Sequence, residues 1–288
     1  MTEHVGVIGC GLMGAGIAEA AAREGIAVTV VETSEQVKSA TARLRRAFEL
    51  AAAKGEMSAA EADTALDRID VTERFERLGD LPLVIEAVPE VREAKAAVFR
   101  ELDKVLQRDD AVLASNTSSI PIIELAAATT RSEWVVGLHF FNPVRTMRLV
   151  EVIPSLRTNE DAIARAKALA RRLGKEPVVA PDRAGFIVNA LLFPYILSAI
   201  RMLEADGPTA TEIDKAMVLG CGVPMGPLAL ADYVGLDTTL SIAESLYDEH
   251  REPQYAPPPL LARMVGAGRL GRKSGRGFHE YAAQRGGN

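Results

Sequence analysis

Residues 135–154 contain a histidine and a glutamate that can act together on a proton. His139 and Glu151 each lie in an apolar run typical of a β-strand. A hairpin centred on Arg145 would place the two side chains opposite each other, ~5 Å apart across the ladder. Histidine, with an ordinary pKa of ~6.5, can take a proton from a hydroxyl, and a carboxylate behind it fixes the tautomer. The two residues are therefore a candidate acid–base pair, and a hydrogen-bonded core histidine is the structural alternative for His139.

Polar residues at two other places can bind an oxygen-rich ligand. The apolar run 111–115 leads into hydroxyl and amide side chains that include Ser118, just before Pro121. Such a cluster at the carboxyl end of a strand can bind a ligand, but it can equally cap a helix. Asn189 is a lone amide in an apolar stretch and must form a hydrogen bond if it is buried. From the pattern alone, Ser118, Asn189 and His139 stay open between functional and structural roles.

A glycine-rich turn near the N-terminus indicates a phosphate-binding site. It has the pattern Gly-x-Gly-x-x-Gly between a strand-like run and a predicted helix at 13–23. The three glycines and the two residues where the helix begins are Gly9, Gly11, Leu12, Met13 and Gly14. A helix N-terminus offers unpaired amides and partial positive charge to a pyrophosphate, which only glycines let approach closely. An ordinary glycine turn is the weaker interpretation in this context.

An acidic residue follows the next apolar run. Glu32 lies 18 positions after Gly14, close to the ~20 expected for the carboxylate that contacts the adenosine ribose in dinucleotide sites. This carboxylate accepts hydrogen bonds from both ribose hydroxyls and repels a 2′-phosphate. We therefore predict a site that prefers NAD to NADP. Such a site indicates hydride transfer, but the fold alone does not identify the reaction.

The elements that must position these residues follow an α/β pattern. Short β-branched runs alternate with helical stretches over the first two thirds of the chain, which is typical of a parallel sheet. We predict strands at residues 4–9, 27–31, 83–87, 111–115, 134–139, 148–153 and 177–180. Residues 35–68 interrupt this rhythm with two helical stretches separated at 54–58. We interpret this insertion as a packing appendage or a substrate arm.

The strand pattern stops near residue 184. Helical stretches separated by Gly-Pro and Pro-rich segments are predicted at 186–204, 211–220, 226–234, 236–248 and 258–268. The predicted fold class is therefore α/β. A Rossmann-type, mainly parallel sheet domain at 1–184 includes the helical arm 35–68, and an all-α domain follows at 185–288.

The composition excludes several classes of protein. The 33 Lys and Arg against 39 Asp and Glu give a net charge of −6, which argues against nucleic-acid binding. The two cysteines suit neither a disulfide framework nor a metal site. The longest uncharged run, 184–200, has 17 residues, fewer than the ~20 of a membrane span, and no signal peptide is visible. We expect a cytoplasmic protein without a metal, a nucleic-acid partner or a membrane partner.

Seven motifs in order resemble the L-3-hydroxyacyl-CoA dehydrogenases over essentially the whole chain. They are GCGLMGAGIAEA, VIEAVPE, SNTSS, GLHFFNPV…LVEVI, GFIVNALL, MGPLALADYVGLD and GRKSGRGFHEY. Length and acidity are most similar to those of the bacterial 3-hydroxybutyryl-CoA dehydrogenases. The resemblance implies reversible oxidation of a short-chain L-3-hydroxyacyl-CoA to the 3-oxoacyl-CoA with NAD. It also implies a homodimer formed through the helical domain.

The resemblance implies roles for individual residues. His139 matches the catalytic histidine and Glu151 its carboxylate partner. Ser118 and Asn189 match polar residues that hold the substrate, and Lys54 matches a basic residue of a CoA-contacting arm. The residues that match contacts of the NAD cofactor are Gly9, Gly11, Leu12, Met13, Gly14, Glu32, Glu90, Lys95, Ser118, Asn142 and Lys273.

Two other functions are compatible with these motifs. A dehydrogenase that acts on a free 3-hydroxy acid, such as L-gulonate, would use the same histidine–glutamate pair and would need no CoA contacts. A non-catalytic structural protein that binds a dinucleotide, like the crystallin relatives of this family, would keep the fold. The intact His139 and Glu151 in an intact sequence context argue against the non-catalytic alternative.

Overall fold

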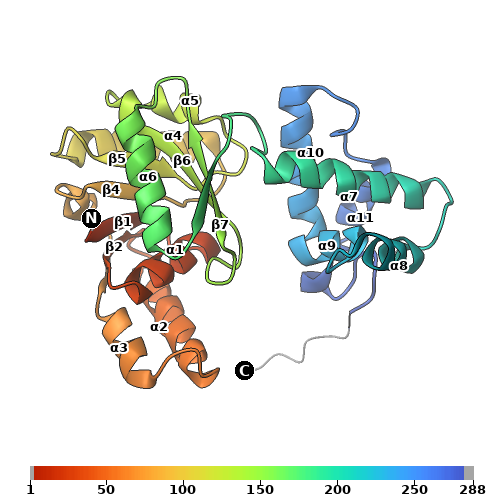
Figure 1. The fold of residues 1–288 in the computed structure, drawn as a ribbon, viewed down its shortest axis with the longest axis horizontal. Helices are drawn as coiled ribbons and strands as arrows, with labels where there is room; N and C mark the ends of the chain where they lie inside the picture. Colours follow the sequence, from red (N-terminus) through yellow and green to blue (C-terminus); the bar gives the residue numbers. More distant parts are fainter. Residues whose placement is uncertain (1–2, 282–288) are drawn as a thin grey trace. The chain divides into compact units, whose positions relative to one another are not determined.

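The structure is a computed structural model that describes residues 3–281. The chain falls into two compact units, which divide between Arg183 and Ala184. The first unit is built around a sheet, and the second consists of helices (Figure 1).

The first unit contains an eight-stranded sheet in the order β3-β2-β1-β4-β5-β6-β7-β8. Strand β7 runs antiparallel to β6, and all other neighbours are parallel. The strands are β1 (His4–Ile8), β2 (Ala27–Val31), β3 (Ile69–Thr72), β4 (Leu83–Glu86), β5 (Val112–Ser115), β6 (Val135–Phe140), β7 (Leu149–Pro154) and β8 (Glu176–Val179). The α/β fold class is confirmed.

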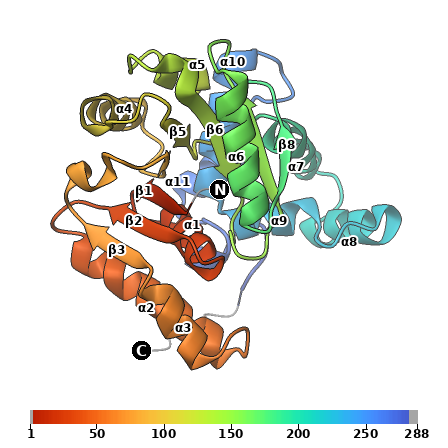
Figure 2. The same ribbon diagram turned by 60° about the vertical axis from the view of Figure 1, so that its left-hand side comes forward.

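Six α-helices accompany this sheet. They are α1 (Leu12–Arg23), α2 (Val37–Ala53), α3 (Ala59–Leu66), α4 (Arg92–Val105), α5 (Ile122–Ala126) and α6 (Glu160–Arg172), with short 3-10 helices at Phe75–Leu78 and Ser132–Trp134. Helices α2 and α3 form the predicted insertion, and Figure 2 shows them beside the β3 end of the sheet. Helix α2 buries Ala40, Leu44 and Phe48, because residues four positions apart share one helix face. The insertion is therefore packed onto the unit.

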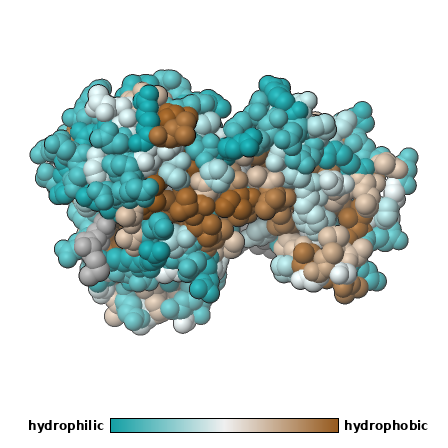
Figure 3. Space-filling view, turned by 45° about the horizontal axis from the view of Figure 1, so that its top comes forward, coloured by the Kyte–Doolittle hydropathy of each residue, from teal (hydrophilic) through white to brown (hydrophobic). Residues whose placement is uncertain are grey.

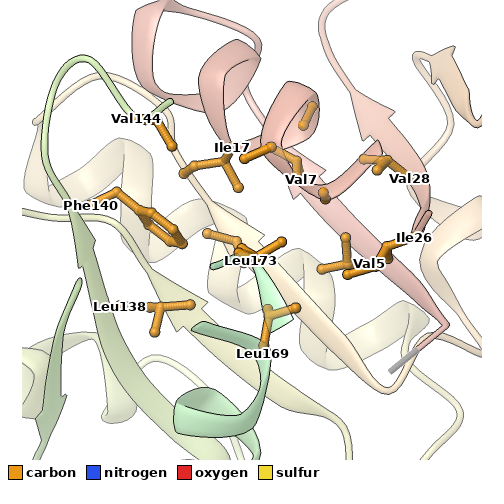
Figure 4. Close-up of a cluster of buried hydrophobic side chains, with 14 of the residues drawn as sticks. Val5, Val7, Ile17, Ile26, Val28, Leu138, Phe140, Val144, Leu169 and Leu173 are labelled. Carbon is orange, nitrogen blue, oxygen red and sulfur yellow. The ribbon is translucent and has the colours of Figure 1, made fainter. Parts of the chain in front are cut away.

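The main core lies on one face of the sheet, against α1 and α6. Figure 4 shows Val5 and Val7 of β1 near Ile17 of α1, and Leu138 and Phe140 of β6 in the same cluster. These side chains come from alternate strand positions, because successive residues of a strand point to opposite faces. The intervening positions therefore belong to the other face.

Polar side chains gather on that other face, towards the ends of three neighbouring strands. Glu86 of β4 pairs with Ser115 of β5, which pairs with Gly137 of β6. His139 lies two residues beyond Gly137 and pairs with Glu151 of β7. The register therefore places Glu86, Ser115, His139 and Glu151 on one face, at the carboxyl edge of β4, β5 and β6, where open α/β sheets bind their ligands.

Seven of the eight strands lie where the sequence predicts them, and β3 was missed. Its four residues, Ile69–Thr72, alternate apolar with polar side chains, and none of them is fully buried. Strand β3 is an edge strand that pairs only with β2 among the described residues. A short, half-exposed edge strand carries little of the continuous apolar signal that marks a buried parallel strand.

Up to residue 281, the second unit consists of five α-helices and a short 3-10 helix. They are α7 (Val188–Glu204), α8 (Ala210–Cys221), α9 (Pro227–Val234), α10 (Leu236–His250), α11 (Pro259–Gly266) and the 3-10 helix Arg272–Ser274. The five predicted helical stretches match these bounds to within about two residues. Between residues 3 and 281, no helix has both the length and the apolar character needed to cross a bilayer.

Candidate active site

His139 and Glu151 face each other across β6 and β7. Nδ1 of His139 lies 2.7 Å from Oε2 of Glu151, and the side chains are only 6% and 0% exposed. The observed register pairs residue 139 with residue 151, so the hairpin predicted from the sequence is confirmed. The two strands thus bring an imidazole and a carboxylate into direct contact.

This contact determines which ring nitrogen can act as a base. An ionised carboxylate only accepts hydrogen bonds, so Nδ1 of His139 carries the proton that it donates to Glu151. In the neutral ring, Nε2 then holds the lone pair that can accept a proton. The ring of Phe141 lies beside the imidazole, with 4.6 Å between the centroids. The strand, the carboxylate and this aromatic ring together orient the imidazole, which is suited to exchange a proton at Nε2.

Ser118 lies in the loop after β5, and this loop is bound to Glu90. One carboxylate oxygen of Glu90 accepts hydrogen bonds from the amides of Ser118 and Ser119, at 2.9 and 3.0 Å, and from the hydroxyl of Thr117 at 2.6 Å. Partial desolvation would raise the pKa of Glu90, but the Lys95 ammonium and these hydrogen bonds lower it below its ordinary value. Glu90 is therefore ionised at neutral pH and holds the Ser118 loop.

A buried ion pair lies behind this loop. Glu86 and Lys95 are 0% and 1% exposed, and Lys95 Nζ donates to Glu86 Oε1 at 2.8 Å. Lys95 Nζ also lies 3.3 Å from Oε2 of Glu90. The resemblance assigned Lys95 to the cofactor, whereas the structure shows it in contact with two carboxylates. Glu86 was not singled out from the sequence.

The glycine-rich turn joins β1 to α1 and fits a pyrophosphate. Gly9 has a φ of +87°, which favours glycine, and a Cβ at Gly14 would overlap the carbonyl oxygen of Gly9. No side chain among residues 3–281 caps helix α1 at its start, Leu12, so its first amides can bind an anion. Burial raises the pKa of Cys10 to about 11, so this thiol stays neutral and adds no negative charge.

Glu32 lies beside this turn, directly after β2. Its two oxygens accept hydrogen bonds from the amides of Cys10 at 2.8 Å and Thr33 at 2.9 Å. Glu32 also lines a cavity of about 660 Å³, together with Gly9, Thr33 and Phe75. This volume is that of a typical small-molecule pocket. The turn, the carboxylate and the cavity fit the adenosine and pyrophosphate parts of a dinucleotide such as NAD.

The other predicted site residues are spread over both units. Asn142 lies exposed in the loop between β6 and β7, and Lys54 is exposed at the end of α2. Asn189 is buried near the start of α7 in the helical unit. Lys273, in the same unit, is half-exposed and bonded to Asp237 at 2.6 Å. The first unit thus brings together His139 and Glu151, and separately Ser118, Glu90 and Lys95.

Sequence reasoning overlooked residues that support the site from behind. Asn116 accepts a hydrogen bond from the amide of Phe140 at 2.9 Å and so ties the loop after β5 to β6. Glu86 is a lone acid at the end of an apolar strand, and Lys95 shares the buried face of α4 with Phe99. Buried charged residues are usually paired, but the sequence does not show which partner each of them takes.

Metal ions are the remaining class of ligand to consider. Among residues 3–281, no three His, Cys, Asp or Glu side chains gather where they could hold a metal ion.

Two family models match this chain almost from end to end. Residues 4–183 match the model described as 3-hydroxyacyl-CoA dehydrogenase, NAD binding domain. Residues 185–281 match the model described as 3-hydroxyacyl-CoA dehydrogenase, C-terminal domain. The two matches follow each other in the same order as the sheet unit and the helical unit.

Individual proteins are similar over nearly their whole length. The chain is 52% identical to a 3-hydroxybutyryl-CoA dehydrogenase of Mycobacterium tuberculosis, over 97% of this chain and 98% of that protein. It is 40% identical to the mitochondrial hydroxyacyl-coenzyme A dehydrogenase of Homo sapiens, over 98% and 92% of the two chains. The solved structure of (S)-3-hydroxybutyryl-CoA dehydrogenase from Ralstonia eutropha matches with a TM-score of 0.93 at 40% identity, covering 98% of this chain and 100% of that one.

Proposed function

This chain belongs to the 3-hydroxyacyl-CoA dehydrogenase family, and on that premise we propose that it oxidises a short-chain L-3-hydroxyacyl-CoA reversibly to the 3-oxoacyl-CoA. The substrate proposed is 3-hydroxybutyryl-CoA, because the similar proteins of Mycobacterium tuberculosis and Ralstonia eutropha are named for it. The observation that carries the proposal is the buried contact of 2.7 Å between His139 and Glu151. Oxidation of a secondary alcohol needs such a base for the hydroxyl proton.

The proton transfer follows from the geometry of the pair. The glycine-rich turn and Glu32 would hold NAD, which would supply the acceptor for the C3 hydride in oxidation and, as NADH, its donor in reduction. Nε2 of His139 takes the 3-hydroxyl proton in oxidation, and Glu151 stabilises the imidazolium that forms. In reduction, the imidazolium gives this proton to the developing alkoxide. Burial of the pair strengthens the contact with Glu151, because the local dielectric is low.

Other residues hold the reactants in this proposal. Ser118 and Asn189 bind the substrate near its 3-oxygen and thioester, and Lys54 contacts the CoA moiety. The NAD contacts proposed from the family match are the turn residues Gly9, Gly11, Leu12, Met13 and Gly14 together with Glu32, Glu90, Lys95, Ser118, Asn142 and Lys273. The positive φ of Gly9 and the hydrogen bonds of Glu32 support the first part of this set.

A single assay tests the substrate and the cofactor. The protein is mixed with acetoacetyl-CoA and NADH, and cofactor absorbance is followed. We expect rapid NADH oxidation, much slower oxidation of NADPH, and little turnover of free acetoacetate. Equal rates with the free acid would favour the alternative of a 3-hydroxy-acid dehydrogenase. NADH binding without turnover of either substrate would favour a non-catalytic protein.

The two directions of the reaction should have opposite pH dependence. Oxidation needs the neutral imidazole of His139, so its rate should rise with increasing pH. Reduction needs the imidazolium, so its rate should fall over the same pH range. The measurement is kcat/KM in each direction as a function of pH. Profiles that move in the same direction would contradict His139 as the group that exchanges the proton.

A homodimer formed through the helical unit is also proposed. Helices α7 and α8 line a largely apolar, open pocket of about 750 Å³, with residues such as Tyr195, Met202 and Met217. On the same helices, the side chains of Met202 and Leu219 are 53% and 74% exposed. Apolar surface on this unit is visible in brown at the right of Figure 3. Exposed apolar side chains beside an apolar pocket are typical of an interface, and a second copy of this chain is the proposed occupant.

The oligomeric state tests this interface directly. Light scattering at micromolar concentration should give the mass of a dimer, and Met202→Glu should shift the protein to a monomer because a charge cannot be buried unpaired at such a surface. The matched control is Leu156→Glu, which changes a side chain that is 99% exposed in the sheet unit. A monomeric parent, or a dimer that survives Met202→Glu, would contradict this interface.

A cytoplasmic location is part of the same proposal. Cys10 and Cys221 are both free thiols, and Cys221 is exposed. Exposed thiols are typical of proteins in a reducing compartment. Cell fractionation with an antibody against the protein tests this location.

A further inference from the structure

We propose that Glu86 is a positioning residue for the reaction and that it acts through Ser118. This inference rests on the proposed function, because it takes Ser118 as the residue that contacts the substrate. Glu86 is the last residue of β4, which lies between β1 and β5. Strand β1 leads into the phosphate-binding turn, and β5 leads into the Ser118 loop. Glu86 therefore lies behind both loops at the ligand-binding edge of the sheet.

The first connection runs through Ser115. Oε2 of Glu86 accepts a hydrogen bond from the Ser115 hydroxyl at 2.6 Å. The same hydroxyl oxygen accepts the amide of Thr117 at 3.2 Å. Thr117 in turn accepts the amide of Ile120 at 2.9 Å. Glu86 thus orients the Ser115 hydroxyl, which in turn binds the amide of Thr117 in the loop after β5.

The second connection runs through Lys95 and Glu90. Oε1 of Glu86 accepts hydrogen bonds from Lys95 Nζ at 2.8 Å and from the amide of Val88 at 2.7 Å. Lys95 Nζ lies 3.3 Å from Glu90, and Glu90 accepts the amides of Ser118 and Ser119. Both connections therefore converge on residues 117–119, one from the β5 side and one from the β4 side.

The burial of this pair points to positioning as its role. Glu86 and Lys95 are 0% and 1% exposed, and removing two charges from water is costly. An apolar pair of similar volume often gives a protein equal or greater stability. Stability alone therefore does not account for the pair. The directional hydrogen bonds of Glu86, in contrast, fix the loop after β4 and the loop after β5. A pair of apolar side chains would leave both loops unconstrained.

A double-mutant cycle tests whether Glu86 acts through Ser118. Glu86→Gln keeps the side-chain volume and removes the charge. We expect it to lower kcat for acetoacetyl-CoA reduction by ~10–100-fold, because small misplacements of a positioning group have effects of this size. The KM for NADH should change little. Ser118→Ala should cost much less in the Glu86→Gln background than in the parent, because residues that act as a unit are not additive.

The matched control is Asp103→Asn. Asp103 is another carboxylate that binds a loop, since it accepts the hydroxyl of Thr129 at 2.6 Å and the amide of Thr130 at 2.9 Å. That loop precedes β6 and so lies at the opposite edge of the sheet. Asp103→Asn should leave kcat unchanged. Independent, multiplicative losses from Glu86→Gln and Ser118→Ala would overturn the proposal, as would an unchanged kcat in Glu86→Gln.

Amide hydrogen exchange, measured without substrate, reports how readily the Ser118 loop opens and does not depend on activity. In Glu86→Gln, the amides of residues 117–119 should exchange ~10-fold faster, while that of Thr130 should not change. If Glu86→Gln does not fold, Ser115→Ala takes its place, because this variant retains the ion pair between Glu86 and Lys95. The amides of residues 117–119 should again exchange faster. Unchanged exchange at 117–119 in the folded variant overturns the proposal. An inactive parent with faster exchange in the variant would contradict the proposed function and still support Glu86 as the residue that holds this loop.

Discussion

Replacement of His139 by alanine should lower kcat for acetoacetyl-CoA reduction by ~10²–10⁴-fold, which is the usual contribution of a positioned general acid–base group. The Kd of NADH should hardly change, because the phosphate-binding turn and Glu32 lie on β1 and β2, whereas His139 lies on β6. Stopped-flow reduction and a fluorescence titration with NADH measure the two quantities separately. The loss should therefore appear in turnover and leave cofactor binding intact.

Two further variants separate chemistry from structure at this position. Alanine removes the donor that lies 2.7 Å from Glu151, and leaving a buried acceptor without its hydrogen bond costs ~1–3 kcal/mol of stability, or more for a charged group. His139→Gln retains an amide that can donate to Glu151 but has no group that titrates, so it should fold and remain slow. The control is His4→Ala at the opposite end of the sheet, where His4 contacts Thr29 at 2.9 Å. A fast His139→Gln enzyme would remove His139 from the mechanism.

The contact between His139 and Glu151 could be predicted because its geometry follows from a local pattern. Two apolar runs joined by a short hairpin leave few registers, and strand alternation then fixes the face on which each side chain lies. That reasoning paired His139 with Glu151, as observed. The glycine-rich turn is similar, because its Gly-x-Gly-x-x-Gly pattern occupies six consecutive residues, and a Cβ at Gly14 would overlap the carbonyl oxygen of Gly9. Both features depend on residues close together in the sequence.

The support behind the site could not be predicted because it depends on packing between distant elements. Glu86 and Lys95 meet only because α4 packs its buried face against the end of β4. Glu90 reaches the amides of Ser118 and Ser119 only because β4 and β5 are neighbours in the sheet. No local periodicity encodes either contact. Strand β3 was missed for a related reason. It is a strand because it pairs with β2, and its own sequence carries only a weak strand pattern.

The glycines of the phosphate-binding turn should respond differently to the same substitution. Alanine at Gly14 places a Cβ on the carbonyl oxygen of Gly9, whereas a Cβ at Gly11 meets no atom within 4 Å among the described residues. Helix propensity favours alanine over glycine within α1 by ~1 kcal/mol. At Gly14 this gain opposes a backbone overlap that costs ~1–3 kcal/mol or more. The overlap therefore outweighs the gain, and the net effect of Gly14→Ala on stability is unfavourable.

Gly14→Ala should therefore lower the free energy of unfolding, measured by urea denaturation without cofactor. Gly11→Ala should leave that free energy nearly unchanged and raise the Kd of NADH by ~10-fold or more, equivalent to ~1.4 kcal/mol of lost contact. The expected loss of affinity has a steric cause. A Cβ at Gly11 would project into open space at the start of α1, and this is where a pyrophosphate would bind the helix amides. Unchanged NADH affinity in a stable Gly11→Ala protein would show that the pyrophosphate does not bind at this turn.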